Sequence, residues 1–369
     1  MLVREVVEKM KLLPRLAARA AALACLLAAA FTAGHGSPAT AKAPEPDPFD
    51  GVELFVDRES LAWEEWQRLT RAGEDRKAAL VWRIAREPGA RWVGKFTKPS
   101  IERKIGPHLE QAEREGKVPV LTVLRAEAIK CGPRYLGGGV AEDRRTRRWY
   151  ADLARVIGSA RVILLFEIDS LGTVDCLARH RRDDRYRLLR YGVRKLTSLP
   201  NTTLYIEAGA SDWEPARSMA RKLRRTGIGM ARGFMLNATH GDWTANNIRY
   251  GLDLSRRVGG KHFVINTAHN GRGPVHYRDG WRRVVVWCNP GLRGIGRAPT
   301  ADTAHPRVDA YLWINRPGYV QSCSHGRVEW NLKRALSVAR YQTDWLRPPK
   351  GTRHGHFKRY PKRALNIPG

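Results

Sequence analysis

An acidic pair follows an apolar run in the middle of the chain. The run Val162–Phe166 is wholly apolar, and Glu167 and Asp169 come directly after it. In barrels of alternating strands and helices, catalytic groups lie at the carboxyl ends of the strands. A carboxyl group beside apolar residues resists ionisation, which a general acid working near neutral pH requires. Position alone leaves two interpretations open, a general acid and an acid that only caps or ion-pairs the strand end.

Short apolar runs typical of strands recur along the chain, separated by charged segments with helical spacing. The strand candidates are Glu53–Val56, Val118–Leu124, Val162–Ile168, Thr203–Ile206, Gly233–Leu236, His262–Ile265, Val284–Trp287 and Ala310–Ile314. The helix candidates include Arg144–Ile157, Asp184–Leu199, Glu214–Thr226, Thr244–Val258 and a closing helix Leu332–Trp345. This alternation predicts an α/β fold, a distorted barrel of about seven or eight parallel strands ringed by helices in a single domain.

Polar or aromatic side chains follow most of the predicted strands. They are Asp57, Asp169, Glu207, Asn237, Asn266, Trp287 and Asn315. Carboxylates and amides bind the hydroxyl groups of sugars, and aromatic rings stack on the apolar faces of pyranose units. We therefore expect a polyhydroxylated ligand at this rim. The chain has 12 Trp, and any single one could instead belong to the core.

Both ends of the chain differ in composition from the predicted domain, residues 51–346. Residues 1–41 read as a secretion signal, because basic residues precede the apolar run Ala20–Phe31 and the small residues Ala39–Ala41 offer a cleavage site. The run is too short for a comfortable membrane span, so we expect a secreted, extracellular protein. Residues 42–50 read as a linker, and residues 347–369, dense in Lys, Arg, His and Pro, as a flexible basic tail.

Four cysteines remain once the signal is removed. An even number in an exported chain suggests two disulfides, for which three pairings exist. We favour Cys131–Cys176 and Cys288–Cys323, because each would tie neighbouring loops that follow strands. No pair has the close spacing of a zinc site, so we expect no metal and no other cofactor.

The chain is strongly basic, with 66 Lys and Arg against 36 Asp and Glu and a formal net charge of +30. Such a surface attracts anionic polymers such as those of cell walls. A genome that spends arginine on solvated helix faces is the alternative explanation. No nucleic-acid-reading motif is present, so we expect no nucleic-acid partner, and we expect a monomer.

Several ordered motifs, from about Phe55 to Trp345, resemble one known family. They are Ile84–Gly94 with Trp92, Glu167–Leu171, Tyr205–Gly209 with Trp213, Gly233–Asn237, Phe263–Thr267, Trp287–Pro290 and Asp309–Trp313. In this order they resemble glycoside hydrolase family six, the cellobiohydrolases and endoglucanases that cut β-1,4-glucan with inversion. Each motif is weak alone, but together they are strong. The family's Glu-Pro-Asp-Ser-Leu is present with Ile168 in place of proline.

The resemblance implies a fold and a set of roles. The fold is a distorted barrel of about seven parallel strands with two disulfides that match the favoured pairing. Asp169 is implied as the general acid that protonates the leaving glycosidic oxygen. Inversion also needs a base on the opposite face, with carboxyl groups roughly 6.5–9.5 Å apart. The positions implied to bind glucosyl units are Trp92, Trp213, Asn237, Trp287 and Asn315.

Two departures from the family pattern concern the acid. The family has Asp before its first disulfide cysteine, where this chain has Lys130, in a loop two residues longer. A cation near Asp169 would lower the pKa of this acid, the wrong direction for an acid catalyst. We hypothesise that Glu127, in the longer loop, supplies the missing carboxylate. Glu207 stands where the family has Asp, which moves the charge by about one methylene.

A third departure concerns the base. Gln321 replaces the family's proposed base, and an amide cannot accept the proton; Asn315 and Tyr319 replace a Lys and a Glu of the same loop. Either a water chain ending at Glu127, Glu207 or Asp57 serves instead, or turnover is slow, or the substrate differs from cellulose. We predict a secreted, inverting hydrolase of β-1,4-glucosidic bonds in cellulose or related β-glucans. The alternative is a catalytically silent glucan-binding protein on the same scaffold.

Overall fold

The computed structural model describes residues 46–94, 100–126, 140–279, 282–286, 288–291, 293–321 and 328–346. The described residues from Asp47 onward form one compact unit. The predicted signal and basic tail lie outside the described residues, as do Glu127, Lys130 and Trp287. The predictions for these segments stay predictions.

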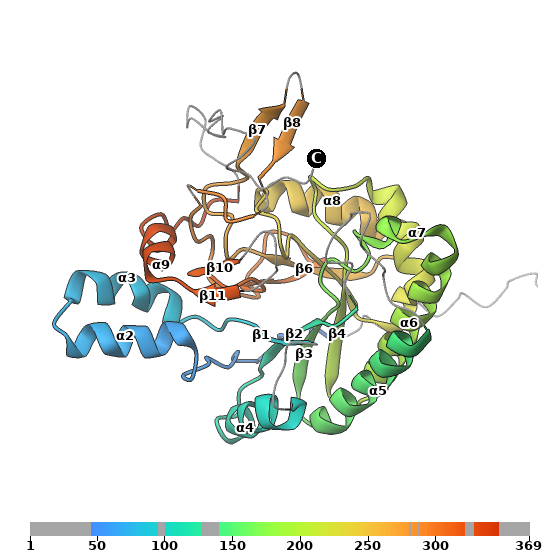
Figure 1. Ribbon diagram of the computed structural model, residues 1–369, viewed down its shortest axis with the longest axis horizontal. Coiled ribbons are helices and arrows are strands. Elements are labelled where there is room, and N and C mark those ends of the chain that lie inside the picture. Colours follow the sequence, from blue (N-terminus) through green and yellow to red (C-terminus); the bar gives the residue numbers. More distant parts are fainter. Residues whose placement is uncertain are drawn as a thin grey trace, which may run out of the picture. The chain divides into compact units, whose positions relative to one another are not determined.

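Seven parallel strands form the central sheet, in the order β1-β2-β3-β4-β5-β6-β9 (Figure 1). Their bounds are β1 Arg91–Gly94, β2 Val120–Leu124, β3 Val162–Phe166, β4 Thr202–Glu207, β5 Gly233–Leu236, β6 His262–Asn266 and β9 Val308–Leu312. The sheet curls, so that the segments at its two edges come together. There the N–H of Ala90, just before β1, donates to the carbonyl oxygen of Trp313, just after β9, at 3.0 Å. The predicted α/β barrel is confirmed.

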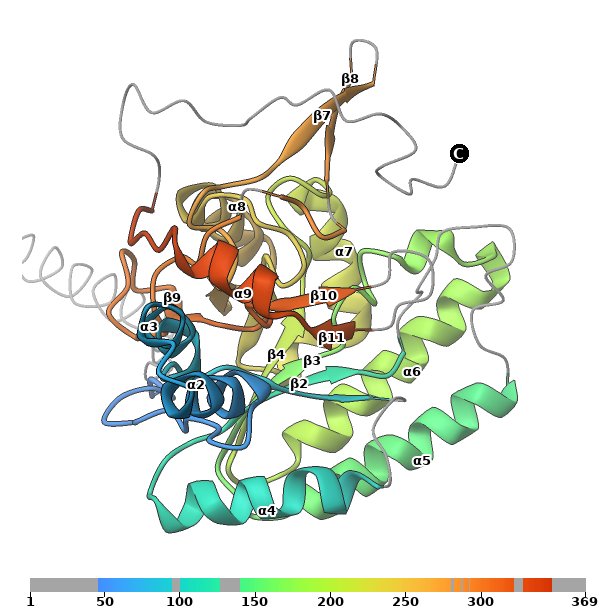
Figure 2. The same cartoon turned by 60° about the vertical axis from the view of Figure 1, so that its left-hand side comes forward.

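Eight α-helices among the described residues surround the sheet. They are α2 Leu61–Arg71, α3 Asp75–Ala85, α4 Ile101–Arg114, α5 Val140–Ile157, α6 Arg179–Thr197, α7 Ala216–Thr226, α8 Thr244–Arg257 and α9 Leu332–Ala339. Figure 2 shows α4, α5 and α6 side by side along one side of the sheet. Ser60, Ser100 and Asn331 start α2, α4 and α9 as N-caps, each accepting a backbone N–H of the first turn. No helix in the described ranges is long and apolar enough to span a bilayer.

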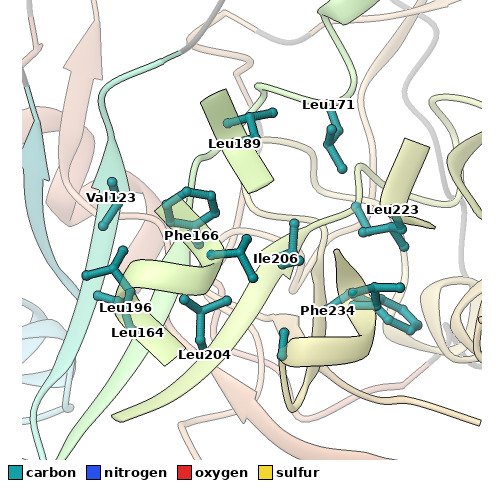
Figure 3. Packing of buried hydrophobic residues seen from close by; sticks show 14 of the residues in the cluster. Val123, Leu164, Phe166, Leu171, Leu189, Leu196, Leu204, Ile206, Leu223 and Phe234 are labelled. Atoms are coloured by element: carbon teal, nitrogen blue, oxygen red, sulfur yellow. The ribbon is translucent and has the colours of Figure 1, made fainter. Parts of the chain in front are cut away.

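Alternate residues of each strand serve two different core layers. In β3, Val162, Leu164 and Phe166 pack outward against the helices, with Leu189 and Leu196 of α6 and Leu223 of α7 in the same cluster (Figure 3). Ile163 and Leu165 belong to a second cluster, formed mainly by the other faces of the strands. A strand buried on both faces needs apolar residues throughout, which explains the unbroken run in the sequence.

Two predicted strands are wrong as members of the barrel. Glu53–Val56 forms only an isolated bridge, between Leu54 and Val118. The run at Val284–Trp287 overlaps β8 (Arg282–Val285), which pairs antiparallel with β7 (His276–Asp279) in a separate hairpin (Figure 2). The first barrel strand is instead β1, and a third sheet pairs β10 (Tyr319–Gln321) with β11 (Val328–Trp330). The closing helix α9 ends six residues before the predicted Trp345.

Candidate functional site

The acidic pair that follows β3 lies in a sharply turned backbone. Glu167 and Asp169 both have φ of 61°, in the left-handed region that non-glycine residues rarely adopt. Such conformations cost free energy and cluster at functional sites. The turn separates the two carboxyl groups, and each has a different set of partners.

Glu167 is a structural carboxylate. It is 1% exposed, and its oxygens accept hydrogen bonds from the Tyr150 hydroxyl at 2.6 Å and the Ser170 hydroxyl at 3.2 Å. They also accept the backbone N–H groups of Arg125 at 3.0 Å and Ala126 at 2.7 Å, directly after β2. The strand-capping interpretation therefore applies to Glu167, which holds the chain where it leaves β2.

Asp169 has a different environment. Its Oδ1 accepts a hydrogen bond from the Thr239 hydroxyl at 2.8 Å, and Thr239 follows β5. Burial raises the pKa of Asp169, while the Thr239 hydrogen bond and the nearby His240 act in the opposite direction. No lysine or arginine of the described ranges forms an ion pair with it. Asp169 is therefore a carboxyl group with a raised pKa at the carboxyl ends of the strands.

Glu207, the last residue of β4, is a second carboxyl group beside the first. It is 1% exposed, and its Oε1 accepts the backbone N–H of Gly209. Its Oε2 is buried, and no described residue forms a hydrogen bond with it. Burial, followed by the charge of Asp169, raises the pKa of Glu207 to about 8. Near neutral pH, Glu207 therefore holds a proton, chiefly because burial disfavours the charged form of its carboxyl group.

This proton makes the stability of the fold depend on pH. The pKa of Glu207 is about 8 in the folded chain against 4.5 without the shift, so only the unfolded chain loses this proton as the pH rises from 4.5 to 8. The free energy of unfolding should fall over this range, by roughly 3 kcal/mol at pH 7 from this group. Glu207→Gln cannot titrate and should lack this decline. Urea unfolding of both proteins at about pH 5 and about pH 7 measures this decline. An equal change in the free energy of unfolding between the two pH values for wild type and variant would contradict the assignment.

Trp213 packs against the turn that carries Asp169. Its ring stacks on the His240 imidazole, with centroids 4.9 Å apart and an interplanar angle of 15°. A Cβ at Gly172 would come within 2.3 Å of the indole, so only glycine fits there. Trp92, in β1, donates its Nε1–H to the carbonyl oxygen of Ile314 at 2.8 Å. Both predicted aromatic positions therefore adjoin residues that follow the carboxyl ends of strands.

The sequence analysis missed a His–Asp pair at this site. His240 Nδ1 lies 2.7 Å from Asp212 Oδ1, and the side chains are each 14% exposed. The hydrogen bond and charge of His240 lower the pKa of Asp212, against the effect of burial. Neither residue directly follows a strand, and they lie 28 residues apart. The available signal in the sequence was that His240 directly follows Thr239 and that Asp212 directly precedes Trp213.

Asn237 and Asn266 are structural amides. Both are fully buried, and each donates its side-chain N–H to backbone carbonyl oxygens of the other's strand exit. Asn237 Oδ1 also accepts the N–H of Asp242 at 3.1 Å. This geometry argues against the predicted hydroxyl-binding role of Asn237, because both its amide atoms are engaged and covered. Asn315 is half-buried and donates to the Ala238 carbonyl oxygen at 3.0 Å.

The predicted substitutes for the base divide into three cases. Asp57 forms an ion pair with Arg91 at 2.7 Å, so its charge is already balanced within the fold. Glu207 holds a proton near neutral pH, and Glu127 lies outside the described residues. Gln321 closes β10, as an amide. Neither of the described candidates, Asp57 or Glu207, is thus placed as a ready base.

Two further predictions concern disulfides and metals. Cys176 and Cys288 are each disulfide-bonded, while Cys131 and Cys323 lie outside the described residues. The pairing Cys131–Cys176 and Cys288–Cys323 stays a prediction. Within the described ranges, no three His, Cys, Asp or Glu side chains gather as ligands for a metal ion.

Comparison with known proteins decides the family. A sequence model described as Glycosyl hydrolases family 6 matches residues 49–344. The chain belongs to this family. Endoglucanase A of Cellulomonas fimi is 33% identical over 300 residues, which cover 80% of this chain and 62% of that protein. Endoglucanase 1 of Streptomyces halstedii is 32% identical over 253 residues, 67% of this chain and 74% of that protein.

Solved structures of family 6 agree in fold. An endoglucanase from Mycobacterium tuberculosis, in complex with methyl-cellobiosyl-4-deoxy-4-thio-β-D-cellobioside, superposes with a TM-score of 0.71 at 32% identity. The match covers 80% of this chain and 99% of that chain. The cellobiohydrolase core domain from Chaetomium thermophilum, at 20% identity and a TM-score of 0.66, shares the fold. The family 6 chain described here spans less than two thirds of the length of the Cellulomonas fimi relative.

Proposed function

We propose that this family 6 chain is a secreted glycoside hydrolase that cuts β-1,4-glucosidic bonds of a β-glucan with inversion. The observation that supports it most is Asp169, a carboxyl group with a raised pKa, at the carboxyl end of β3 and free of any ion pair with the described residues. The two relatives named as endoglucanases agree with this reaction. The crystallised Mycobacterium relative holds a thio-linked cellobioside derivative, which suggests the substrate class.

In the proposed mechanism, Asp169 protonates the leaving glycosidic oxygen. Glu207 assists, because a neutral carboxyl group does not repel the negative charge that Asp169 gains when it gives up its proton. Water attacks the opposite face of the sugar ring, and Glu127 accepts its proton, directly or through a second water. Since Gln321 cannot serve as this base, slow turnover is expected.

The remaining roles complete the proposal. Trp92, Trp213 and Trp287 stack on glucosyl units. Asn315 Oδ1 accepts a hydrogen bond from the Arg316 N–H, and its second lone pair binds a hydroxyl group of the substrate. The disulfides Cys131–Cys176 and Cys288–Cys323 stabilise the exported monomer. Its basic surface associates weakly with anionic wall polymers.

The test is the configuration of the product. We expect the purified chain to release the α-anomer first from cellohexaose, observed by proton NMR before mutarotation. A β-anomer as first product would exclude the inverting mechanism. The alternative proposal is a silent glucan-binding protein, which is favoured because neither Asp57 nor Glu207 is placed as a ready base. Calorimetric binding of cellohexaose with no product after prolonged incubation would select it.

A further inference from the structure

Arg316 lies at the same rim as the proposed acid. It follows β9 directly after Ile314 and Asn315, and the side chain of Asn315 donates to the carbonyl oxygen of Ala238 at 3.0 Å. Ala238 precedes Thr239, whose hydroxyl is bound to Asp169. These contacts join the exits of three strands, β3, β5 and β9. Arg316 is therefore linked to Asp169 through Asn315, Ala238 and Thr239.

The guanidinium of Arg316 is held between two aromatic rings. Its central carbon lies 4.8 Å from the centroid of Trp92 and 4.6 Å from that of Tyr319. The Nε atom is buried, and no described residue accepts a hydrogen bond from it. Burial lowers the pKa of Arg316, and no described carboxylate offsets this effect. The cation is thus positioned by stacking, and no carboxylate of the described residues balances its charge.

The groups packed around the Arg316 backbone add no negative charge. His269 is hydrogen-bonded to that backbone, and burial, with the charges of Arg334 and Arg293, lowers the pKa of His269 to about 3. Arg334 and Arg293 donate to the carbonyl oxygens of Pro290 and Gly273 rather than to carboxylates. Asp212 and Asp242 act on Arg293, and Asp57 and Glu64 act on Tyr319, but no described carboxylate acts on Arg316 itself. An anion that reached the Arg316 guanidinium would therefore meet no described acid already paired with it.

A purely structural role explains Arg316 poorly. Arg316 is half-buried, and stacking on aromatic rings stabilises a cation only modestly. Burying its Nε–H without a hydrogen-bond acceptor is unfavourable. An apolar side chain such as Leu or Met would fill the space between Trp92 and Tyr319 without that cost. The balance favours a cation kept for a ligand.

We propose that Arg316 binds a carboxylate carried by the glycan, so that the preferred substrate is a β-glucan with C6-carboxylated, glucuronosyl-type units. A guanidinium presents a planar pair of N–H donors that matches a carboxylate. Because Arg316 covers one face of Trp92, a neutral glucosyl unit cannot stack on that face without displacing it. This inference rests on the proposed hydrolase function and names its substrate class.

The experiment compares cellohexaose with its C6-oxidised analogue. We expect the wild-type chain to prefer the oxidised oligosaccharide, and Arg316→Gln to lower the ratio of kcat/KM between the two substrates by about 10- to 100-fold. Arg316→Lys should recover only part of the ratio, because an ammonium cannot make the bidentate contact. Arg147→Gln is the matched control. Its guanidinium also covers a ring, 4.7 Å from the centroid of Tyr191, but between α5 and α6, and the ratio should not change.

Calorimetry with the same two oligosaccharides on Asp169→Asn separates this inference from the hydrolase proposal. If the oxidised oligosaccharide binds and Arg316→Gln weakens this binding, the inference is supported even when no hydrolysis occurs. Hydrolysis of both substrates at a ratio that Arg316→Gln leaves unchanged overturns the inference and leaves the hydrolase proposal intact. If Asp169→Asn with Arg316 intact binds the two oligosaccharides equally well, the inference is also overturned.

Discussion

Asp169→Asn is expected to lower kcat on cellohexaose by about 10²- to 10⁴-fold. An amide cannot give a proton to the leaving glycosidic oxygen, and the departing alkoxide is then a poor leaving group. Structural damage should be small, because the hydrogen bond from Thr239 goes to Oδ1, an oxygen that asparagine retains. Steady-state hydrolysis of the oligosaccharide by the wild type and the variant measures the loss.

The leaving group provides the control for this prediction. The dinitrophenolate of a dinitrophenyl cellobioside leaves without being protonated. The Asp169→Asn variant should therefore retain most of the wild-type activity on this substrate. Equal losses on both substrates would assign Asp169 to binding or positioning rather than to proton transfer. Equal activity of the two proteins on cellohexaose would remove the acid role altogether.

Glu167→Ala is expected to lower the free energy of unfolding by about 3–5 kcal/mol. The substitution leaves the Tyr150 hydroxyl and the N–H groups of Arg125 and Ala126 without their acceptor, in a place that is 1% exposed. It also leaves a cavity between the exits of β2 and β3. Denaturant unfolding measures the loss.

A surface glutamate serves as the matched control for Glu167. Glu53 has a side chain that is 79% exposed and an ion pair with Lys117 at 3.4 Å. Glu53→Ala should change the free energy of unfolding by less than about 1 kcal/mol. If Glu167→Ala proved no more destabilising than Glu53→Ala, the buried hydrogen-bond network would carry no weight in the fold.

The barrel strands differ in how well the sequence reveals them. Val162–Phe166 is readable because both faces of β3 are buried, which demands an unbroken apolar run. Arg91–Gly94 is not readable, since its four residues mix a cation, an aromatic and a glycine and become a strand only by pairing with β2. The apolar run near Val284 misleads for the opposite reason. It has strand propensity, but its partner is β7 in a local hairpin.

The site divides in the same way. The ordered motifs of the sequence were enough to find the family and to place Asp169 at a strand exit, because local order along the chain carries that information. The position after a strand did not by itself separate Glu167 from Asp169, and only the resemblance singled out Asp169. The physical difference lies in Tyr150, Ala126 and Thr239, which other elements supply.

Arg316 depends even more on the tertiary structure. The sequence determined a positive charge after β9 and an aromatic residue in the segment before α4. Only the curling of the sheet, which brings its two edge strands together, placed the guanidinium between Trp92 and Tyr319. Burial, partner and charge balance are properties of residues that meet in space, and these properties decide which side chains support the fold and which are left for a ligand.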